Sequence, residues 1–194
     1  MNRGTRKTTL ALLALLAMSL SACGPPQGSL HTLVGSTMGT GYEVRLPGHL
    51  SDPEELLNAI EQELAVIDLE MSTWRKDSAI SRFNAGPGET AVSIPGRLLE
   101  VIAAAQRLSG QTDGALDITL MPLALAWGFQ GSHAPQVPDP ETLAQLGRVT
   151  GMHLLELSAE QATLSKQHSG VMIDVSALAK GYAVDRLAEL LVAR

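Results

Sequence analysis

Near its end the chain reads Ile173-Asp174-Val175-Ser176-Ala177-Leu178-Ala179-Lys180-Gly181-Tyr182-Ala183, a run in which polar side chains fall between two expected elements. The alternating pattern predicts a strand that delivers Asp174 and Ser176, and a helix is expected from about Ala179 to Arg194. Lys180 would then lie near a helix N-terminus, where free amides, the helix dipole and a cation together favour phosphate. The glycine spacing of a Walker loop is absent, so the run is a general candidate for a phosphate or metal site.

The rest of the chain mixes strand-like and helix-like patterns. Residues 31–46 and 153–175 show the two-residue alternation of strands. Helices are expected to start near Pro53, after Pro95 and at Asp139. The first helix has one apolar face, made of Leu56, Ile60, Leu64, Ile67 and Met71. Hairpin-like strands beside separate helices predict an α+β fold.

Two segments upstream hold more polar and aromatic residues than packing needs. Ser36–Gly41 combines glycines with hydroxyls, which lets backbone amides approach a ligand, although a simple turn at a strand end has the same composition. Met71–Ser78 surrounds Trp74 with polar residues just past the first helix. A tryptophan in this position either stacks on a flat heterocycle or is a half-buried surface residue.

A third segment, Thr112–Asp117, leads into Ala126-Trp127-Gly128-Phe129. Its Asp113-Gly114 pair predicts a turn. Asp117 follows small and apolar residues, where a carboxylate can meet a hydroxyl or ring nitrogen of a ligand. The alternative is that Asp117 caps the helix that follows.

The first residues resemble an export signal. Arg3, Arg6 and Lys7 precede an apolar run that is too short to span a bilayer but has the length of a signal-peptide core. The run ends in Leu20-Ser21-Ala22-Cys23, the pattern of a lipobox, and the alternative is a buried N-terminal helix that contains a cysteine. Because Cys23 is the only cysteine, no internal disulfide can form.

These features predict three parts of the chain: a lipoprotein signal peptide over residues 1–22, a lipidated tether over 23–30 and a folded domain over 31–194. We expect the mature protein to be lipid-anchored through Cys23 to a membrane of the bacterial cell envelope and to face the periplasm. Without residues 1–22 the chain keeps 11 of its 14 Lys and Arg residues against 20 Asp and Glu, a net charge near −9. Such a charge makes nucleic-acid binding improbable.

Four motifs taken together are more specific than any one of them. They appear in the order MGT at Met38–Thr40, STWRKDSAISRFN at Ser72–Asn84, TDGALD at Thr112–Asp117 and IDVSALAKGYAVD at Ile173–Asp185. With the lipobox, this order resembles the FAD:protein FMN transferases, the ApbE family. The resemblance runs from about Gly35 to the last residue and implies a flavin-transferase domain of the α+β class.

Members of that family are expected to split FAD with a divalent cation, usually Mg²⁺, and to transfer FMN to a threonine or serine hydroxyl of a partner protein, releasing AMP. The known acceptors are largely flavin-carrying subunits of membrane redox complexes. By matching positions, the resemblance assigns contacts with FAD to Met38, Trp74, Ala115, Leu116, Asp117, Asp174 and Lys180. Many relatives have Phe where this chain has Leu116. The backbone carbonyl of Ala177 is expected to be a Mg²⁺ ligand, and no catalytic residue is assigned.

The resemblance also implies that relatives continue well past Arg194 with a segment containing Asp and Thr that completes the metal site. The sequence is therefore expected to be the N-terminal part of such a domain, truncated at its C-terminus, and residues 1–194 alone are expected not to transfer FMN at an appreciable rate. The alternatives are a periplasmic FAD-binding lipoprotein, an FAD pyrophosphatase that releases FMN and AMP, and an inactive truncated form.

Overall fold

The computed structural model describes residues 29–129 and 137–194. The expected signal peptide and Cys23 lie outside these residues. The chain divides into two compact units, one with residues 29–34 and 43–53 and the other with residues 35–42 and 54–194. Within the two described ranges, no helix has both the length and the apolar character needed to cross a membrane.

The first unit holds the open end of a hairpin formed by β1 (Leu30–Thr37) and β2 (Thr40–Pro47). Ser29 and Gly48 close this end, because the Gly48 N–H donates to the Ser29 carbonyl at 2.9 Å and the Ser29 hydroxyl donates to the Gly48 carbonyl at 2.7 Å. The expectation of extended structure over residues 31–46 is confirmed.

The tip of the hairpin belongs to the second unit, where the Tyr42 side chain lies over Gly35. A Cβ atom on Gly35 would lie only 2.4 Å from Cζ of Tyr42. Only glycine leaves room for the ring to lie across the strand at this position.

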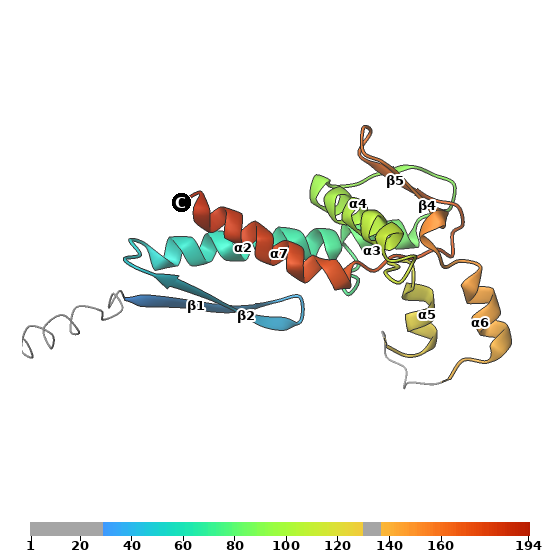
Figure 1. The fold of residues 1–194 in the computed structure, drawn as a ribbon, viewed down its shortest axis with the longest axis horizontal. Coiled ribbons are helices and arrows are strands. Elements are labelled where there is room, and N and C mark those ends of the chain that lie inside the picture. Colours follow the sequence, from blue (N-terminus) through green and yellow to red (C-terminus); the bar gives the residue numbers. More distant parts are fainter. Residues whose placement is uncertain (1–28, 130–136) are drawn as a thin grey trace, which may run out of the picture. The chain divides into compact units, whose positions relative to one another are not determined.

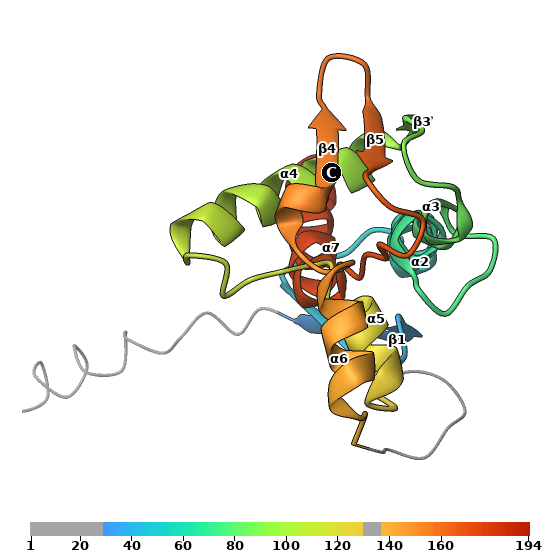
Figure 2. The same cartoon turned by 90° about the vertical axis from the view of Figure 1, so that its right-hand side faces the viewer.

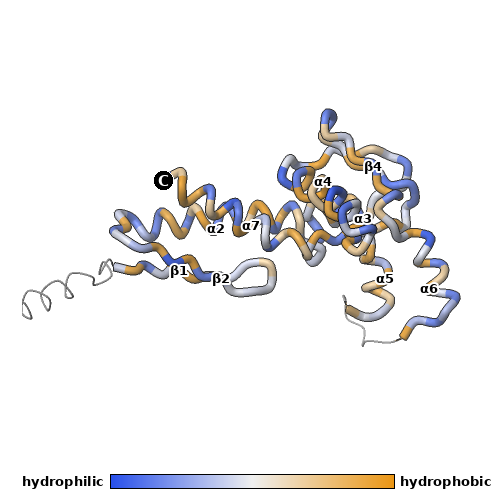
Figure 3. The backbone as a smooth tube through the Cα atoms, in the orientation of Figure 1, coloured by the Kyte–Doolittle hydropathy of each residue, from blue (hydrophilic) through white to orange (hydrophobic). Residues whose placement is uncertain are grey.

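The second unit contains the helices α2 (Pro53–Met71), α3 (Ala79–Ala85), α4 (Gly96–Gln111) and α7 (Ser176–Val192) (Figure 1). Along α2, apolar and polar residues alternate with the helical period (Figure 3). Its buried residues are Leu56, Ile60, Leu64, Ile67 and Met71, the face that the sequence predicts. α4 packs against α7.

A small antiparallel sheet completes the unit in the order β3-β5-β4, with β3 (Val92–Ser93), β4 (Leu155–Ser158) and β5 (Thr163–Lys166). Leu157 pairs with the fully buried Leu164, and a 3₁₀ turn over Met152–Leu154 precedes β4. α5 (Met121–Ala126) and α6 (Pro140–Gly147) lie side by side (Figure 2). Separate helices and a small antiparallel sheet confirm the α+β class.

The structure corrects the expected strand before Asp174. Residues 171–175 form no strand, and α7 begins at Ser176 rather than at Ala179. The reason is that the N–H and carbonyl of Ile173 bond to the Asn84 side chain and the Asp174 N–H bonds to Ile118, which leaves no ladder for a strand. The helix α3 was not among the sequence predictions, and α5 entered them only as the helix that Asp117 would cap.

Candidate functional site

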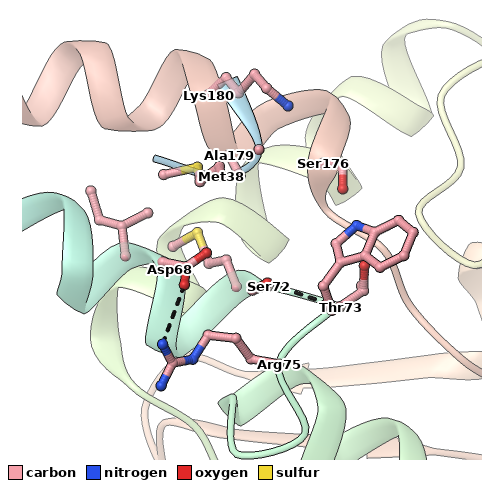
Figure 4. Close-up of a pocket in the computed structure, with 12 residues that line it drawn as sticks. Met38, Asp68, Ser72, Thr73, Arg75, Ser176, Ala179 and Lys180 are labelled. Atoms are coloured by element: carbon pink, nitrogen blue, oxygen red, sulfur yellow. Dashed lines mark hydrogen bonds and ion pairs between the residues drawn. The ribbon is translucent and has the colours of Figure 1, made fainter. Parts of the chain in front are cut away.

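A cavity of about 420 Å³ opens between the hairpin tip, the end of α2 and the start of α7, all within the second unit (Figure 4). It is lined by Met38, Gly39, Ile67, Asp68, Met71, Ser72, Thr73, Trp74, Arg75, Ser176, Ala179 and Lys180. Its volume is within the range of small-molecule sites. Three of the seven residues predicted to contact FAD, Met38, Trp74 and Lys180, therefore face one space.

The hairpin tip brings Met38 to the cavity through a two-residue turn. Met38 and Gly39 have φ values of 48° and 71°, the left-handed conformation that a tight hairpin turn requires at both positions. Glycine adopts it freely, whereas a methionine with positive φ is uncommon. Such strain is concentrated at ligand-binding positions, which agrees with the predicted role of Met38.

The loop after α2 carries Trp74, which lines the same cavity as its neighbours Ser72, Thr73 and Arg75, labelled in Figure 4. The Ser78 hydroxyl donates to the Ser72 carbonyl at 2.6 Å and accepts the Ser81 N–H at 3.0 Å, so it closes the loop and caps α3 at once. Trp74 itself is 73% exposed, more than the half-buried tryptophan considered as an alternative. Because the hydrogen bonds of Ser78 hold the loop and the indole is open to solvent, the indole can stack on a planar ligand.

Charged groups of this loop and of α2 compensate one another in the lining of the cavity. Arg75 donates to both carboxylate oxygens of Asp77, at 3.1 and 2.8 Å, and its guanidinium lies 3.6 Å from the Asp68 carboxylate of α2. The hydrogen bond from Arg75 lowers the pKa of Asp77 below its ordinary value. Arg75 therefore has two anionic partners before any ligand binds.

Helix α7 contributes a second cation, Lys180, to the cavity lining. Lys180 is exposed and lines the cavity, and its ammonium has no ion pair or hydrogen bond with any residue that the structure describes. Ser176 is the first residue of α7, and its N–H donates to Oδ1 of Asp174 at 2.8 Å. Its hydroxyl donates to the same oxygen. Asp174 is thus placed at the α7 start, although it does not line the cavity itself.

The other predicted segment, Ala115–Asp117, lies outside the cavity lining. Oδ1 of Asp117 accepts the N–H and the hydroxyl of Thr119, at 2.7 and 2.6 Å. It does not cap α5, whose N-cap is Leu120, so that alternative is wrong. The segment is nevertheless joined to the α7 start, because the Asp174 N–H donates to the Ile118 carbonyl at 2.8 Å.

The described residues do not form a complete Mg²⁺ site. Across residues 29–129 and 137–194, no group of three or more His, Cys, Asp or Glu side chains is arranged to hold a metal. Ala177 lies in the first turn of α7, where helix geometry directs its carbonyl toward the N–H of Gly181. One lone pair remains for a cation, so Ala177 stays a predicted ligand but cannot form a site alone.

Sequence reasoning missed Asp68 as a residue of the cavity. Asp68 lies four residues after Leu64 and three before Met71, along the buried face of α2. A carboxylate within this apolar face was the feature of the sequence that could have indicated a site residue. A second cavity of about 300 Å³ shares Met38, Asp68 and Arg75 with the first.

An ion-pair network links α2 and α7, which line the cavity, to α4. Glu63 of α2 accepts two bonds from Arg97 of α4, at 3.1 and 2.9 Å, and one from Arg186 of α7 at 3.2 Å. Tyr182 of α7 donates to Glu100 of α4 at 2.8 Å. Burial and this hydrogen bond raise the pKa of Tyr182 to about 12.

The class that the fold and cavity define is an α+β domain whose ligand cavity suits a planar heterocycle carrying phosphate. An aromatic and a methionine side chain line this cavity together with a lysine on the first turns of a helix. A sequence model described as the ApbE family matches residues 38–194, and the chain belongs to that family.

Relatives and solved structures agree with this assignment. The FAD:protein FMN transferase of Vibrio cholerae is 38% identical over 190 residues, covering 96% of this chain and 55% of the relative. That of Haemophilus influenzae is 38% identical over 186 residues, covering 91% and 53%. The flavin transferase ApbE structure from V. cholerae has a TM-score of 0.81 at 36% identity, covering 86% of this chain and 54% of that one. The apo flavinyl transferase ApbE of Pseudomonas stutzeri has a TM-score of 0.80 at 32% identity, covering 86% and 54%. The chain spans about half the length of the curated relatives it matches.

Proposed function

We propose that the protein transfers FMN from FAD to a threonine or serine hydroxyl of a partner flavoprotein and releases AMP, in a Mg²⁺-dependent reaction. The observation that carries the proposal is the meeting of Met38, Trp74 and Lys180 around one cavity in a chain of the ApbE family. Curated relatives named FAD:protein FMN transferase support the same reaction.

Each side of the cavity has its own part in binding FAD. Trp74 and Met38 offer an aromatic face and a polarizable thioether to the planar rings. Lys180 supplies positive charge for the pyrophosphate, and Asp174 holds the start of α7 beside it. Ala115, Leu116 and Asp117 follow from the resemblance alone, and their link to Asp174 through Ile118 connects them with this wall.

The reaction exchanges one phosphorus–oxygen bond for another. The acceptor hydroxyl oxygen attacks the phosphorus of the FMN half, the bond from that phosphorus to the AMP phosphate breaks, and the hydroxyl proton leaves. Negative charge grows on the departing AMP, and a fixed cation lowers the barrier by stabilising that charge. Two cations line the cavity, and Arg75 is already paired with Asp77 and Asp68, so Lys180 is the one available for this task.

The test is direct flavin transfer. The purified protein, with any sequence that continues past Arg194 in the genome, is incubated with FAD, Mg²⁺ and a threonine-bearing acceptor flavoprotein subunit. The acceptor is examined for in-gel flavin fluorescence while AMP is quantified. Residues 1–194 alone are assayed beside it and are expected to give no appreciable label. Labelled acceptor with one AMP per flavin supports the transferase.

The remaining outcomes separate the alternatives. AMP and free FMN without label indicate an FAD pyrophosphatase. FAD binding without AMP indicates a flavin-binding protein, and no binding contradicts the proposal. A parallel reaction with the acceptor threonine replaced by alanine controls for non-covalent flavin.

We also propose that the protein is a lipoprotein of the bacterial cell envelope that faces the periplasm and meets acceptor subunits of membrane redox complexes. The lipobox ending at Cys23 supports this location. Cys23→Ser should abolish lipid attachment and leave uncleaved precursor in the cell. Unchanged processing and membrane partitioning of that variant would contradict the anchor.

A further inference from the structure

Asn84, in the last turn of α3, is a buried polar side chain that the proposed binding site does not use. It is 8% exposed. Its Nδ2 donates to the carbonyl of Ile173 at 2.9 Å, and its Oδ1 accepts the N–H of Ile173 at 2.8 Å. One amide thus satisfies both backbone groups of a residue 89 positions away, in the manner of a strand partner.

Lys166 holds the same region from the other side. The residue is 1% exposed, and its Nζ donates to the carbonyls of Asn84, Val171 and Ser169 at 2.9, 3.0 and 3.2 Å. All three acceptors are main-chain oxygens, and the ammonium lies 5.2 Å from the centre of the Phe83 ring. Lys166 therefore ties α3 to the turn that leads into Ile173.

The chain from Asn84 to the cavity is short. Ile173 is followed by Asp174, whose N–H is bound by the Ile118 carbonyl and whose Oδ1 accepts the N–H of Ser176. Ser176 is the first residue of α7 and lines the cavity together with Lys180. A shift of Ile173 would move Asp174 and the first turn of α7 with it.

We propose that Asn84 is a positioning residue for the ligand cavity. Its side chain holds the backbone of Ile173, and the Ile118 carbonyl holds the N–H of the next residue, Asp174. Together these bonds orient the start of α7 toward FAD. The inference rests on the proposed function, because FAD is the ligand whose binding the orientation serves. Asn84 touches no ligand and acts through the backbone of Ile173.

The test compares Asn84→Ala and Asn84→Asp with Asn58→Ala, a matched control on an exposed position of α2. Hydrogen–deuterium exchange is measured over residues 171–178 and over α2, and FAD affinity is measured by titration of protein shown to be folded by circular dichroism. For Asn84→Ala we expect faster exchange confined to residues 171–178 and an FAD Kd raised about tenfold or more. The control should match the unsubstituted protein.

Asn84→Asp keeps the size of the side chain and the acceptor for the Ile173 N–H but loses the donor. It leaves no cavity but places a carboxylate oxygen against the Ile173 carbonyl, so its FAD Kd and local exchange should both exceed those of the unsubstituted protein. Unchanged exchange and affinity in a folded Asn84→Ala variant would overturn the inference. Faster exchange spread equally over α2 with unchanged affinity would also overturn it, since that result describes a loss of general stability.

The two proposals fail in different ways. If the unsubstituted protein binds no FAD, the proposed function fails, and the local exchange result alone decides whether Asn84 holds the segment. If the unsubstituted protein binds FAD and Asn84→Ala binds it equally well, only the positioning role fails.

Discussion

Two lysines of this domain have opposite surroundings. Lys166, at the end of β5, is 1% exposed and donates to three backbone carbonyls. Lys180, in α7, is exposed at the cavity, and its ammonium has no ion pair or hydrogen bond within the described part of the chain. The hydrogen bonds of the Lys166 ammonium stabilise the fold, whereas the Lys180 ammonium is available to a ligand. Residue type alone does not distinguish them.

The electrostatics of the two sites follow from this difference. Burial lowers the pKa of Lys166, because the carbonyls that surround it are dipoles rather than charges. The ammonium is kept because its three hydrogen bonds satisfy carbonyls that would otherwise be buried without partners. For Lys180, solvent already supplies the hydration, so a phosphate can replace water without a change in the fold.

Replacing the buried cation should produce the largest effect on stability. Lys166→Met conserves most of the volume but leaves the carbonyls of Asn84, Ser169 and Val171 without their donor. Each such group costs about 1–3 kcal/mol, partly offset because no charge remains buried, so we expect a loss of about 2–4 kcal/mol in the free energy of unfolding. Urea unfolding measures it.

Lys76→Met, at an exposed position of the loop after α2, is the matched control and should stay within about 0.5 kcal/mol of the unsubstituted protein. If Lys166→Met is as stable as this control, the hydrogen bonds of the ammonium only balance the cost of burying it. The contrast with Lys180 would then be one of exposure alone.

Replacing the exposed cation should affect binding and leave stability alone. Lys180→Met is expected to weaken FAD binding ten- to a hundredfold, the loss of one charge-assisted hydrogen bond. Its free energy of unfolding should change by less than about 0.5 kcal/mol, because no described residue depends on Lys180. Isothermal titration and urea unfolding on the same preparation separate the two quantities. Wild-type affinity would remove Lys180 from the site.

Asp174 lies between these two cases. Its Oδ1 satisfies the N–H of Ser176 at the α7 start, and its position is also predicted to contact FAD. Asp174→Ala should therefore weaken FAD binding and also lower the free energy of unfolding by about 1 kcal/mol, the usual loss of a helix-terminal hydrogen bond. Asp174→Asn keeps an acceptor and should retain most of the stability. An Asp174→Ala variant with normal stability would show that solvent replaces the carboxylate at Ser176.

The sequence could predict those parts of the molecule in which one period governs several residues. The buried face of α2 was predicted residue by residue, because five apolar positions repeat with the helical period. The start of α6 followed from Asp139, whose side chain accepts the Thr142 N–H at 2.9 Å. The cavity residues Met38, Trp74 and Lys180 came from motifs rather than from periodicity.

Long-range polar contacts could not be predicted. Lys166 ends a short alternating segment, where a lysine normally indicates an exposed strand end, yet its acceptors lie on α3 and in the turn after β5. Asn84 belongs to a quoted motif, but nothing local indicates that it bonds to Ile173. The failed strand over residues 171–175 has the same origin, since a side chain took the place of a neighbouring strand.

The smallest effect concerns alkaline pH and tests whether keeping Lys166 protonated lowers the free energy of unfolding. Because its folded pKa lies below the ordinary value of 10.5, the unfolded chain binds more protons between the two values. The free energy of unfolding contributed by Lys166 should therefore rise as the pH increases through that window. Tyr182 acts in the opposite direction between pH 10 and about 12, since its folded pKa is raised and the folded chain keeps the proton. Both proteins contain Tyr182, so its effect cancels in the difference between unsubstituted protein and Lys166→Met. That difference, followed by urea unfolding as the pH is raised toward 10.5, should grow with pH, and a flat difference would show that Lys166 has an ordinary pKa in the fold.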